Sequence, residues 1–131
     1  MIDIDGADLL PGSLTAPGQF DWLEDATAAE LDEMVFGVVG LAADGTVECY
    51  NAAEGRLSGL TPARVIGRNF FTEVAPCTNN FMVAHRFETA AELDEAVNYV
   101  FAFHLARTKV LLCLLKRPGA RRRYLVVQRR D

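Results

Sequence analysis

The chain has 131 residues, of which half are apolar and 24% are charged, and its formal net charge is −5. This length is typical of one globular domain, and the apolar content excludes disorder of the whole chain. No apolar stretch approaches the ~20 residues of a membrane span, residues 1–5 are acidic where a secretory signal would be basic, and a net acidic chain is a poor candidate for nucleic-acid binding. We therefore expect a cytoplasmic protein without a membrane or nucleic-acid partner.

The first half of the chain predicts two strands between helical segments. Residues 1–19 are rich in glycine and proline and predict an irregular arm, whereas 21–34 predict one or two short amphipathic helices. Residues 36–41 predict a strand, Asp44-Gly45 a hairpin turn, and 46–50 a second strand. Glycines break the stretch 51–87 into short helices and loops.

Three further strands are predicted after a helix or loop over 90–96. Alternation predicts a strand over 97–105, with one face formed by Val97, Tyr99, Phe101, Phe103 and Leu105. Residues 110–115 are apolar on both faces, which is typical of a central strand covered on both sides, and 124–128 form the last strand after a Pro-Gly turn.

These elements predict an α+β fold. A five-stranded antiparallel sheet would carry short helices on one face and an N-terminal segment on the other. We divide the chain into an N-terminal cap segment, residues 1–34, and a core domain, residues 35–131.

The charge is unevenly distributed along the chain. Residues 1–54 contain twelve of the eighteen acidic residues and no lysine or arginine, and all thirteen basic residues follow from Arg56 onward. One interpretation is a latch within the domain, in which the acidic residues of 21–33 lie near Lys116, Arg117 and the 121–123 cluster. The alternative is two solvated charged surfaces that never meet, because exposed ion pairs contribute little.

Two groups of residues are candidates for chemistry. Tyr50, Glu54 and Ser58 are spaced by four, which places Glu54 and Ser58 on one helix face. The alternative is that Asn51 caps this helix and Glu54 lies in solvent. Cys77 precedes a helix predicted over 81–87, a position typical of reactive thiols, and the alternative is a small buried hydrophobe.

The remaining cysteines and the histidines offer no further site. Cys49 and Cys113 lie within predicted strands, and no two cysteines form a C-x-x-C pair, so free thiols are expected. His85 and His104 lack metal-ligand spacing to a cysteine, so no metal site is expected.

Two motifs resemble the photoactive yellow protein family of light-sensing PAS domains. The first is Tyr50-Asn-Ala-Ala-Glu-Gly55, and the second is Val65-Ile-Gly-Arg-Asn-Phe-Phe-Thr-Glu-Val-Ala-Pro-Cys-Thr78. The resemblance extends from about residue 36 to residue 128 and implies the PAS fold.

The resemblance also implies a chromophore and its binding residues. In this family p-coumaric acid (4-hydroxycinnamic acid) is attached as a thioester to the cysteine that matches Cys77. Its phenolate accepts hydrogen bonds from the residues that match Tyr50 and a protonated Glu54. Ser58 would support the tyrosine, and Phe101 would pack beside the ring.

Four positions complete or alter the expected chromophore site. Phe70 belongs to the second motif and is expected to line the site. Leu60 stands where the family has an arginine lid, and Phe103 where a tyrosine is common. Leu105 replaces a loop methionine that assists thermal return of the dark state, so we expect slow dark recovery.

The resemblance implies a blue-light photoreceptor that is not an enzyme. Trans/cis isomerisation, proton transfer from Glu54 and partial unfolding would produce the signal for an unknown downstream partner, and we expect a monomer or weak dimer. The first alternative is a PAS-type ligand-binding or interaction module that lacks or has changed the chromophore. A more distant alternative is a thiol enzyme that uses Cys77 and Glu54.

Overall fold

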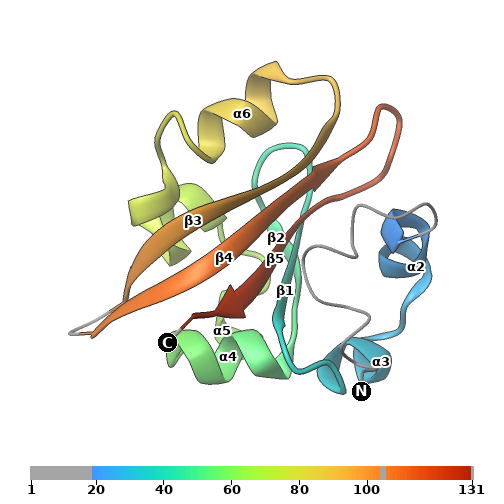
Figure 1. The fold of residues 1–131 in the computed structure, drawn as a ribbon. Helices are drawn as coiled ribbons and strands as arrows, with labels where there is room; N and C mark the ends of the chain where they lie inside the picture. The colour runs from blue at the N-terminus through green and yellow to red at the C-terminus, as the bar shows by residue number, and fades with distance from the viewer. Residues whose placement is uncertain (1–18, 104–105, 131) are drawn as a thin grey trace.

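A computed structural model describes residues 19–103 and 106–130 and contains one five-stranded antiparallel sheet (Figure 1). The strand order is β2-β1-β5-β4-β3. The strands are β1 (Gly37–Leu41), β2 (Val47–Tyr50), β3 (Leu93–Phe103), β4 (Ala106–Lys116) and β5 (Arg123–Arg129). The predicted sheet is therefore confirmed, and the long β3–β4 hairpin forms one side of it.

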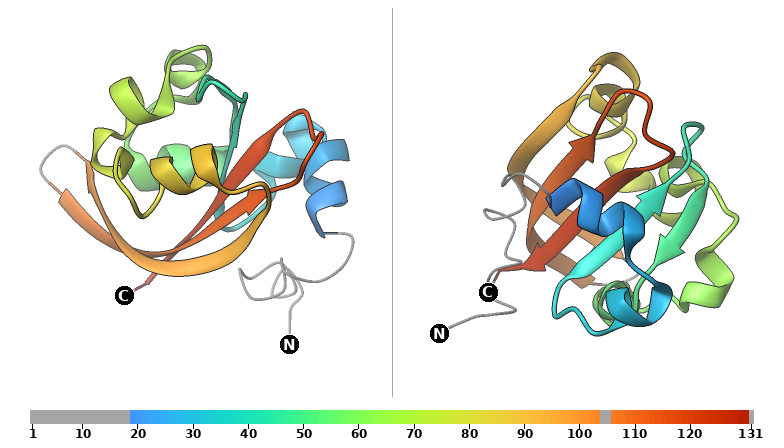
Figure 2. Two further views of the ribbon diagram at one scale, coloured as in Figure 1. Left: turned by 90° about the horizontal axis from the view of Figure 1, so that it is seen from above. Right: turned by 90° about the vertical axis from the view of Figure 1, so that its right-hand side faces the viewer.

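Short helices cover both faces of the sheet. Between β2 and β3 the chain forms α4 (Ala52–Ser58), α5 (Pro62–Val65), the π-helix η2 (Phe70–Val74), the 3-10 helix η3 (Pro76–Thr78) and α6 (Ala84–Thr89). Two helices precede the sheet, α2 (Gln19–Asp25) and α3 (Ala28–Asp32). Seen from above, α4 and α6 lie on one side of the sheet and α2 on the other (Figure 2). This arrangement is the one predicted.

Local sequence explains where the chain turns. Thr27 and Glu30 form a reciprocal capping box at the start of α3, with N–H···O distances of 2.8 and 3.1 Å. In the β1–β2 turn Gly45 adopts a φ of 91°, which favours glycine, and Asp44 Oδ1 accepts a hydrogen bond from Thr46 N at 2.9 Å. The hairpin predicted at Asp44-Gly45 is confirmed.

Two clusters of buried apolar side chains occupy the two faces of the sheet. The inner core lies between the sheet and the helices that follow β2; it comprises Val39, Leu41, Val47, Tyr50, Val65, Phe70, Val74, Ala75, Val83, Phe87, Leu93, Phe101, Val110, Leu112, Leu114, Leu125 and Val127. The outer core lies beneath α2 and α3; it comprises Phe20, Leu23, Leu31, Met34, Phe36, Val38, Cys113, Leu115, Tyr124 and Val126. Strand β4 contributes alternate residues to both clusters, which confirms the prediction that it is covered on both sides.

The prediction for residues 90–96 is wrong. Residues 90–96 were expected to form a helix or loop, but β3 begins at Leu93 and pairs with β4 without interruption as far as Phe103 and Ala106. The exposed acids Asp94 and Glu95 obscured the strand pattern. β3 is an edge strand in the sheet order, and charged side chains are common on edge strands because they discourage pairing with another chain.

The acidic and basic halves of the chain meet at the outer core. Arg117 Nη1 lies 3.0 Å from Asp21 Oδ1, and the Arg117 guanidinium lies 4.8 Å from the centre of the Phe20 ring. Tyr124 Oη donates a hydrogen bond to Glu24 Oε2 at 2.6 Å. The charged halves are therefore not two separate surfaces, although the Arg117–Asp21 pair is largely exposed to solvent.

The structure does not test every prediction made from the sequence. Residues 1–18 of the arm predicted over 1–19, and the positions of His104 and Leu105, lie outside the described residues, whereas Gln19 begins α2 instead of belonging to the arm. The division at residue 34 stays a prediction. Within the part of the chain that the structure describes, no helix is long and apolar enough to cross a membrane.

The outer core predicts that α2 is held mainly by apolar packing. Leu23 is 1% exposed, so Leu23→Ala should lower the free energy of unfolding by about 2–4 kcal/mol. Asp21→Asn should lower it by less than ~1 kcal/mol, because the ion pair is exposed. Urea denaturation of both variants measures this, with Asp25→Asn on the same helix as the control. An equal loss for Asp21→Asn and Leu23→Ala would show that charge holds the helix.

Candidate functional site

The end of β2 and the helix that follows it bring Tyr50, Glu54 and Ser58 together. β2 ends at Tyr50 and α4 begins at Ala52, so the chain turns from strand to helix within two residues. Tyr50 Oη donates a hydrogen bond to Ser58 Oγ at 2.8 Å, and both side chains are buried. The spacing of four therefore does place these groups on one side of α4.

Asn51 fixes this turn. Its Oδ1 accepts hydrogen bonds from Glu54 N at 3.1 Å and from Val38 N at 2.8 Å. Its Nδ2 donates to the carbonyl oxygens of Leu31 at 2.8 Å and Phe36 at 3.0 Å. Asn51 thus caps α4, as one interpretation predicted, but the part of that interpretation that leaves Glu54 in solvent is wrong, because Glu54 is 0% exposed.

The Glu54 carboxyl is the unusual group of the site. Neither of its oxygens has a hydrogen-bond partner among the described residues. Burial raises the pKa of Glu54 from its ordinary value of 4.5 to about 8, so the carboxyl is mainly protonated at neutral pH. A buried carboxyl without a partner is costly, and native proteins usually satisfy such groups. The site therefore fits a ligand that presents a hydrogen-bond acceptor to Glu54.

Tyr50 offers a second donor beside it. Burial, together with the neighbouring Glu54, raises the pKa of Tyr50, and the hydrogen bond to Ser58 only partly opposes this. The phenol therefore stays neutral at physiological pH. Two neutral O–H groups in a water-poor environment are suited to stabilise an anionic oxygen. The charge-assisted hydrogen bonds that they donate would replace the hydrogen bonds that the anion loses to water.

Apolar side chains surround these polar groups. Phe70 and Phe101 are fully buried in the inner core, the cluster that also contains Tyr50. Leu60 and Cys77 are half-buried and pack against the same cluster. The structure thus places four of the remaining predicted site residues around one core, whereas Leu105 lies outside the described residues.

The predicted helical setting of Cys77 is wrong. Cys77 lies in the middle of η3, and the following α-helix begins only at Ala84 rather than at residue 81. Asn80 explains the delay, because its Oδ1 accepts hydrogen bonds from Met82 N at 2.9 Å and Val83 N at 3.1 Å in the intervening turn. Six residues therefore separate Cys77 from the first residue of α6.

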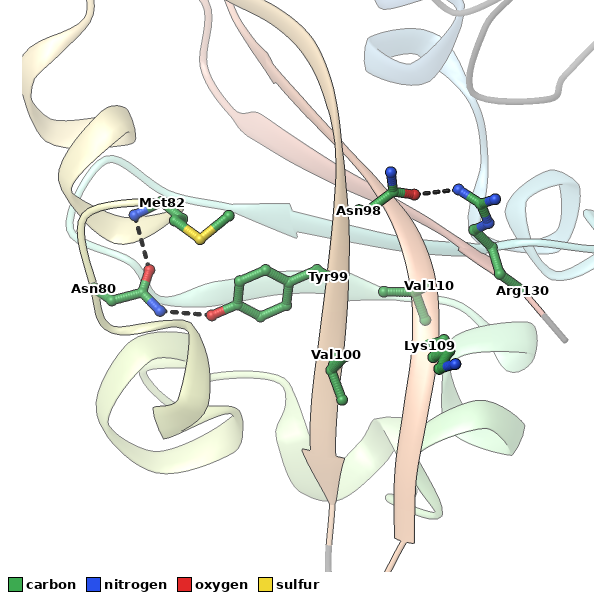
Figure 3. A pocket seen from close by; sticks show the side chains of 8 residues that line it. All are labelled: Asn80, Met82, Asn98, Tyr99, Val100, Lys109, Val110 and Arg130. Atoms are coloured by element: carbon green, nitrogen blue, oxygen red, sulfur yellow. Dashed lines mark hydrogen bonds between the residues drawn. The ribbon is translucent and has the colours of Figure 1, made fainter.

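Two residues that sequence reasoning missed hold the Cys77 backbone. Tyr99 Oη donates a hydrogen bond to the carbonyl oxygen of Cys77 at 2.6 Å. Asn80 Nδ2 donates to the same oxygen at 3.1 Å. It also donates to Tyr99 Oη at 2.6 Å (Figure 3). Strand alternation predicts that Tyr99 and Phe101 share one face of β3, and their ring centres lie 5.8 Å apart. The missing information was the tertiary contact between β3 and the loop after Cys77.

An open groove of about 700 Å³ lies beside this contact. It is lined by Asn80, Met82, Asn98, Tyr99, Val100, Lys109, Val110 and Arg130 (Figure 3). Neither Tyr50 nor Glu54 nor Phe101 lines it. The groove is therefore a surface feature next to the Cys77 turn and not the buried polar site itself.

The other two cysteines, Cys49 and Cys113, pack at the outer core. All three thiols are free, as predicted. Burial raises the pKa of Cys113 to about 12, and it also raises the pKa of Cys49. Cys113 belongs to the outer core and Cys49 packs against it, whereas Tyr50 belongs to the inner core and Cys77 packs against that cluster. Reactivity at neutral pH is therefore disfavoured at these two positions.

Comparisons with known proteins agree on one family. The chain is 41% identical over 100 residues to a photoactive yellow protein of Rhodothalassium salexigens, covering 71% of this chain and 79% of that protein. It is 37% identical over 97 residues to a photoactive yellow protein of Halochromatium salexigens, covering 72% and 78%. No protein-family model matches the chain.

Solved structures support the same assignment. The photoactive yellow protein domain of the sensor histidine kinase Ppr from Rhodospirillum centenum matches with a TM-score of 0.76 and 37% identity, over 82% of this chain and 97% of that domain. The PAS domain of an HTR-like protein from Haloarcula marismortui matches with a TM-score of 0.56 and 18% identity, over 86% and 96%, and this supports the fold alone. The chain therefore belongs to the photoactive yellow protein family and has the PAS fold of its sensor domains.

Proposed function

We propose that this protein is a blue-light photoreceptor in which p-coumaric acid is linked as a thioester to Cys77. The observation that carries the proposal is the Glu54 carboxyl beside Tyr50, which is buried and has no hydrogen-bond partner among the described residues. Its pKa of about 8 keeps it mainly protonated at neutral pH. Such a costly arrangement is expected where a bound group completes the hydrogen bonding. When bound, p-coumarate supplies a phenolate and a double bond that isomerises from trans to cis on absorbing blue light.

Tyr50, Glu54 and Ser58 would rearrange to hold the phenolate. A tyrosine hydroxyl has one proton, and in this structure Tyr50 donates it to Ser58. With an anion in the site, Tyr50 would donate to the anion and Ser58 would donate to Tyr50. Glu54 would donate the second hydrogen bond from its protonated carboxyl.

Proton transfer from Glu54 would destabilise the folded state. Once Glu54 has given up its proton, a carboxylate is left in a site that excludes water. An unpaired buried charge costs several kcal/mol, which is a large part of the ~5–15 kcal/mol that stabilises a small domain. We infer that part of the fold then opens, and that residues 19–34 on the outer face are the segment released to an unidentified downstream protein.

A second candidate function rests on Leu60. This position carries an arginine lid in the family, and here an apolar side chain packs against the inner core instead. A PAS module that has lost or changed the chromophore, and that binds another ligand or a protein, would have the same fold.

Reconstitution distinguishes the two functions. Purified protein mixed with an activated ester of p-coumaric acid should gain the mass of one p-coumaroyl group and a visible absorption band. Cys77→Ala should abolish both changes, and Cys49→Ala should leave both intact. Mass spectrometry and absorption spectroscopy measure this. A protein that stays colourless contradicts the photoreceptor, and a mass gain without a visible band shows that the site does not hold the phenolate.

Replacement of Glu54 tests its role as proton donor. Glu54→Gln keeps a hydrogen-bond donor of similar size but removes the transferable proton. The variant should still bind the chromophore, with a shifted absorption maximum and hindered protonation of the phenolate after a light flash. Flash photolysis measures both. A photocycle identical to that of the wild-type protein would exclude Glu54 as the donor.

The pKa of Glu54 also predicts how stability depends on pH in the chromophore-free protein. The folded-state pKa of about 8 lies above the ordinary value of 4.5, so the folded state binds this proton more tightly than the unfolded state. The contribution of Glu54 is therefore greatest below pH ~4.5 and declines by up to about 1.4 kcal/mol per pH unit as the pH rises to ~8.

Urea denaturation across this pH range measures the effect. Glu54→Gln should remove this part of the decline, while the contributions of all other groups stay in both proteins. Parallel curves for the wild-type protein and Glu54→Gln would contradict the raised pKa.

A further inference from the structure

Strand β1 contacts Glu54 through a residue that has no side chain. A Cβ atom built on Gly37 would overlap Oε1 of Glu54, and it would lie 3.0 Å from the Cβ and 3.1 Å from the Cδ of the same side chain. No distance below 3.0 Å is expected for a real Cβ contact, so the carboxyl occupies the space that a methyl group at Gly37 would need. Only glycine at this position leaves that space open.

Hydrogen bonds do not determine where the Glu54 carboxyl lies. Neither oxygen has a partner among the described residues, so its position depends on the shape of its surroundings. The two sides of the contact are also locked together. Asn51 accepts a hydrogen bond from Val38 N at 2.8 Å, and Asn51 N donates to the carbonyl oxygen of Val38 at 3.1 Å. Because these bonds tie β1 to the start of α4, the backbones cannot separate to make room for a methyl group.

We propose that Gly37 is a positioning residue for Glu54: the missing side chain creates the space in which the carboxyl lies. The importance of this contact for light sensing rests on the proposed function, but the contact itself does not. A methyl group at Gly37 would displace the carboxyl, and in the chromophore-bound protein it would alter the hydrogen bond from Glu54 to the phenolate.

Gly37 also separates Glu54 from a groove at the protein surface. This groove of about 290 Å³ is lined by Val35, Phe36, Gly37, Ala53, Arg56, Leu57, Val127 and Arg129. The backbone of β1 at Gly37 is thus part of the wall between the carboxyl and solvent.

Tyr50 is the titratable group that interacts with Glu54, and further charged groups lie on α3, α4 and β5. Tyr50 at the end of β2 interacts electrostatically with Glu54. Arg56 on α4 and Arg129 on β5 line the surface groove on the other side of Gly37. Asp32 at the end of α3 accepts a hydrogen bond from Ala52 N at 2.8 Å, at the first residue of α4. A displaced carboxyl would change its distance to these groups and to water, and its ionisation would change accordingly.

A double-mutant cycle on the chromophore-free protein tests the proposal. Gly37→Ala should raise the unfolding equilibrium constant by roughly 5- to 100-fold, the range for a methyl group inserted into a packed site. Gly37→Ala should have the same effect in the Glu54→Gln background, because glutamine has the same size as glutamate. The effect of Gly37→Ala should vanish or reverse in the Glu54→Ala background, because alanine leaves the space of the carboxyl empty. If Gly37→Ala alone does not fold, the proposal requires that Gly37→Ala combined with Glu54→Ala does fold.

Gly40→Ala is the matched control. Gly40 lies on the same strand, and a Cβ there would lie 2.5 Å from Cys49 Sγ and not near Glu54. Its effect on stability should be the same in the wild-type, Glu54→Gln and Glu54→Ala backgrounds. An effect of Gly37→Ala that is equally independent of residue 54 overturns the proposal.

The pH profile provides a readout that a general loss of packing would not change. The midpoint of the Glu54 ionisation, obtained from the pH dependence of stability relative to Glu54→Gln, should shift by about half a pH unit or more in Gly37→Ala. It should not shift in Gly40→Ala. An unchanged midpoint overturns the proposal, whereas failure of the proposed photoreceptor function would appear only in the reconstitution with p-coumarate.

Discussion

The burial of one protonated carboxyl is the constraint on which the site depends. Glu54 is removed from water by the inner core on one side and by β1 on the other, and no described side chain compensates it. This buried carboxyl without a partner is a local cost to the stability of the fold. Such local cost is typical of functional sites, where stability is given up for chemistry or signalling. The same carboxyl connects the fold to the proposed function, because its charge state changes the stability of the domain.

Asn51 connects this carboxyl to the outer face of the protein. Its side chain bonds at once to the start of α4, to β1 and to the carbonyl of Leu31 in α3. The helix that carries Glu54 and the segment that covers the outer core therefore share a single buried amide. A rearrangement of α4 cannot leave these bonds unchanged, and breaking a buried hydrogen bond leaves a costly unpaired group.

Much of this arrangement is predictable from sequence, for physical reasons that also explain the errors. The strand over 110–115 is predictable because its residues are apolar on both faces, and the strand over 124–128 because a Pro-Gly turn precedes it. The proximity of Tyr50, Glu54 and Ser58 is predictable because their spacing of four is a local property. The start of β3 is not predictable from local sequence, because the charged residues Asp94 and Glu95 fit a strand only where that strand lies at the edge of the sheet. The contact of Tyr99 with Cys77 and that of Gly37 with Glu54 join segments far apart in sequence, which no local pattern encodes.

The apolar docking of α2 has a consequence for any state in which this helix leaves the sheet. Phe20 and Leu23 pack on Tyr124, Val126 and neighbouring side chains that are almost completely buried. Their separation would expose two complementary apolar surfaces, one on the helix and one on the sheet. Exposed apolar patches of this kind promote association between proteins. The lifetime of such an open state should then depend on protein concentration, because a second molecule could occupy the exposed sheet before the helix returns.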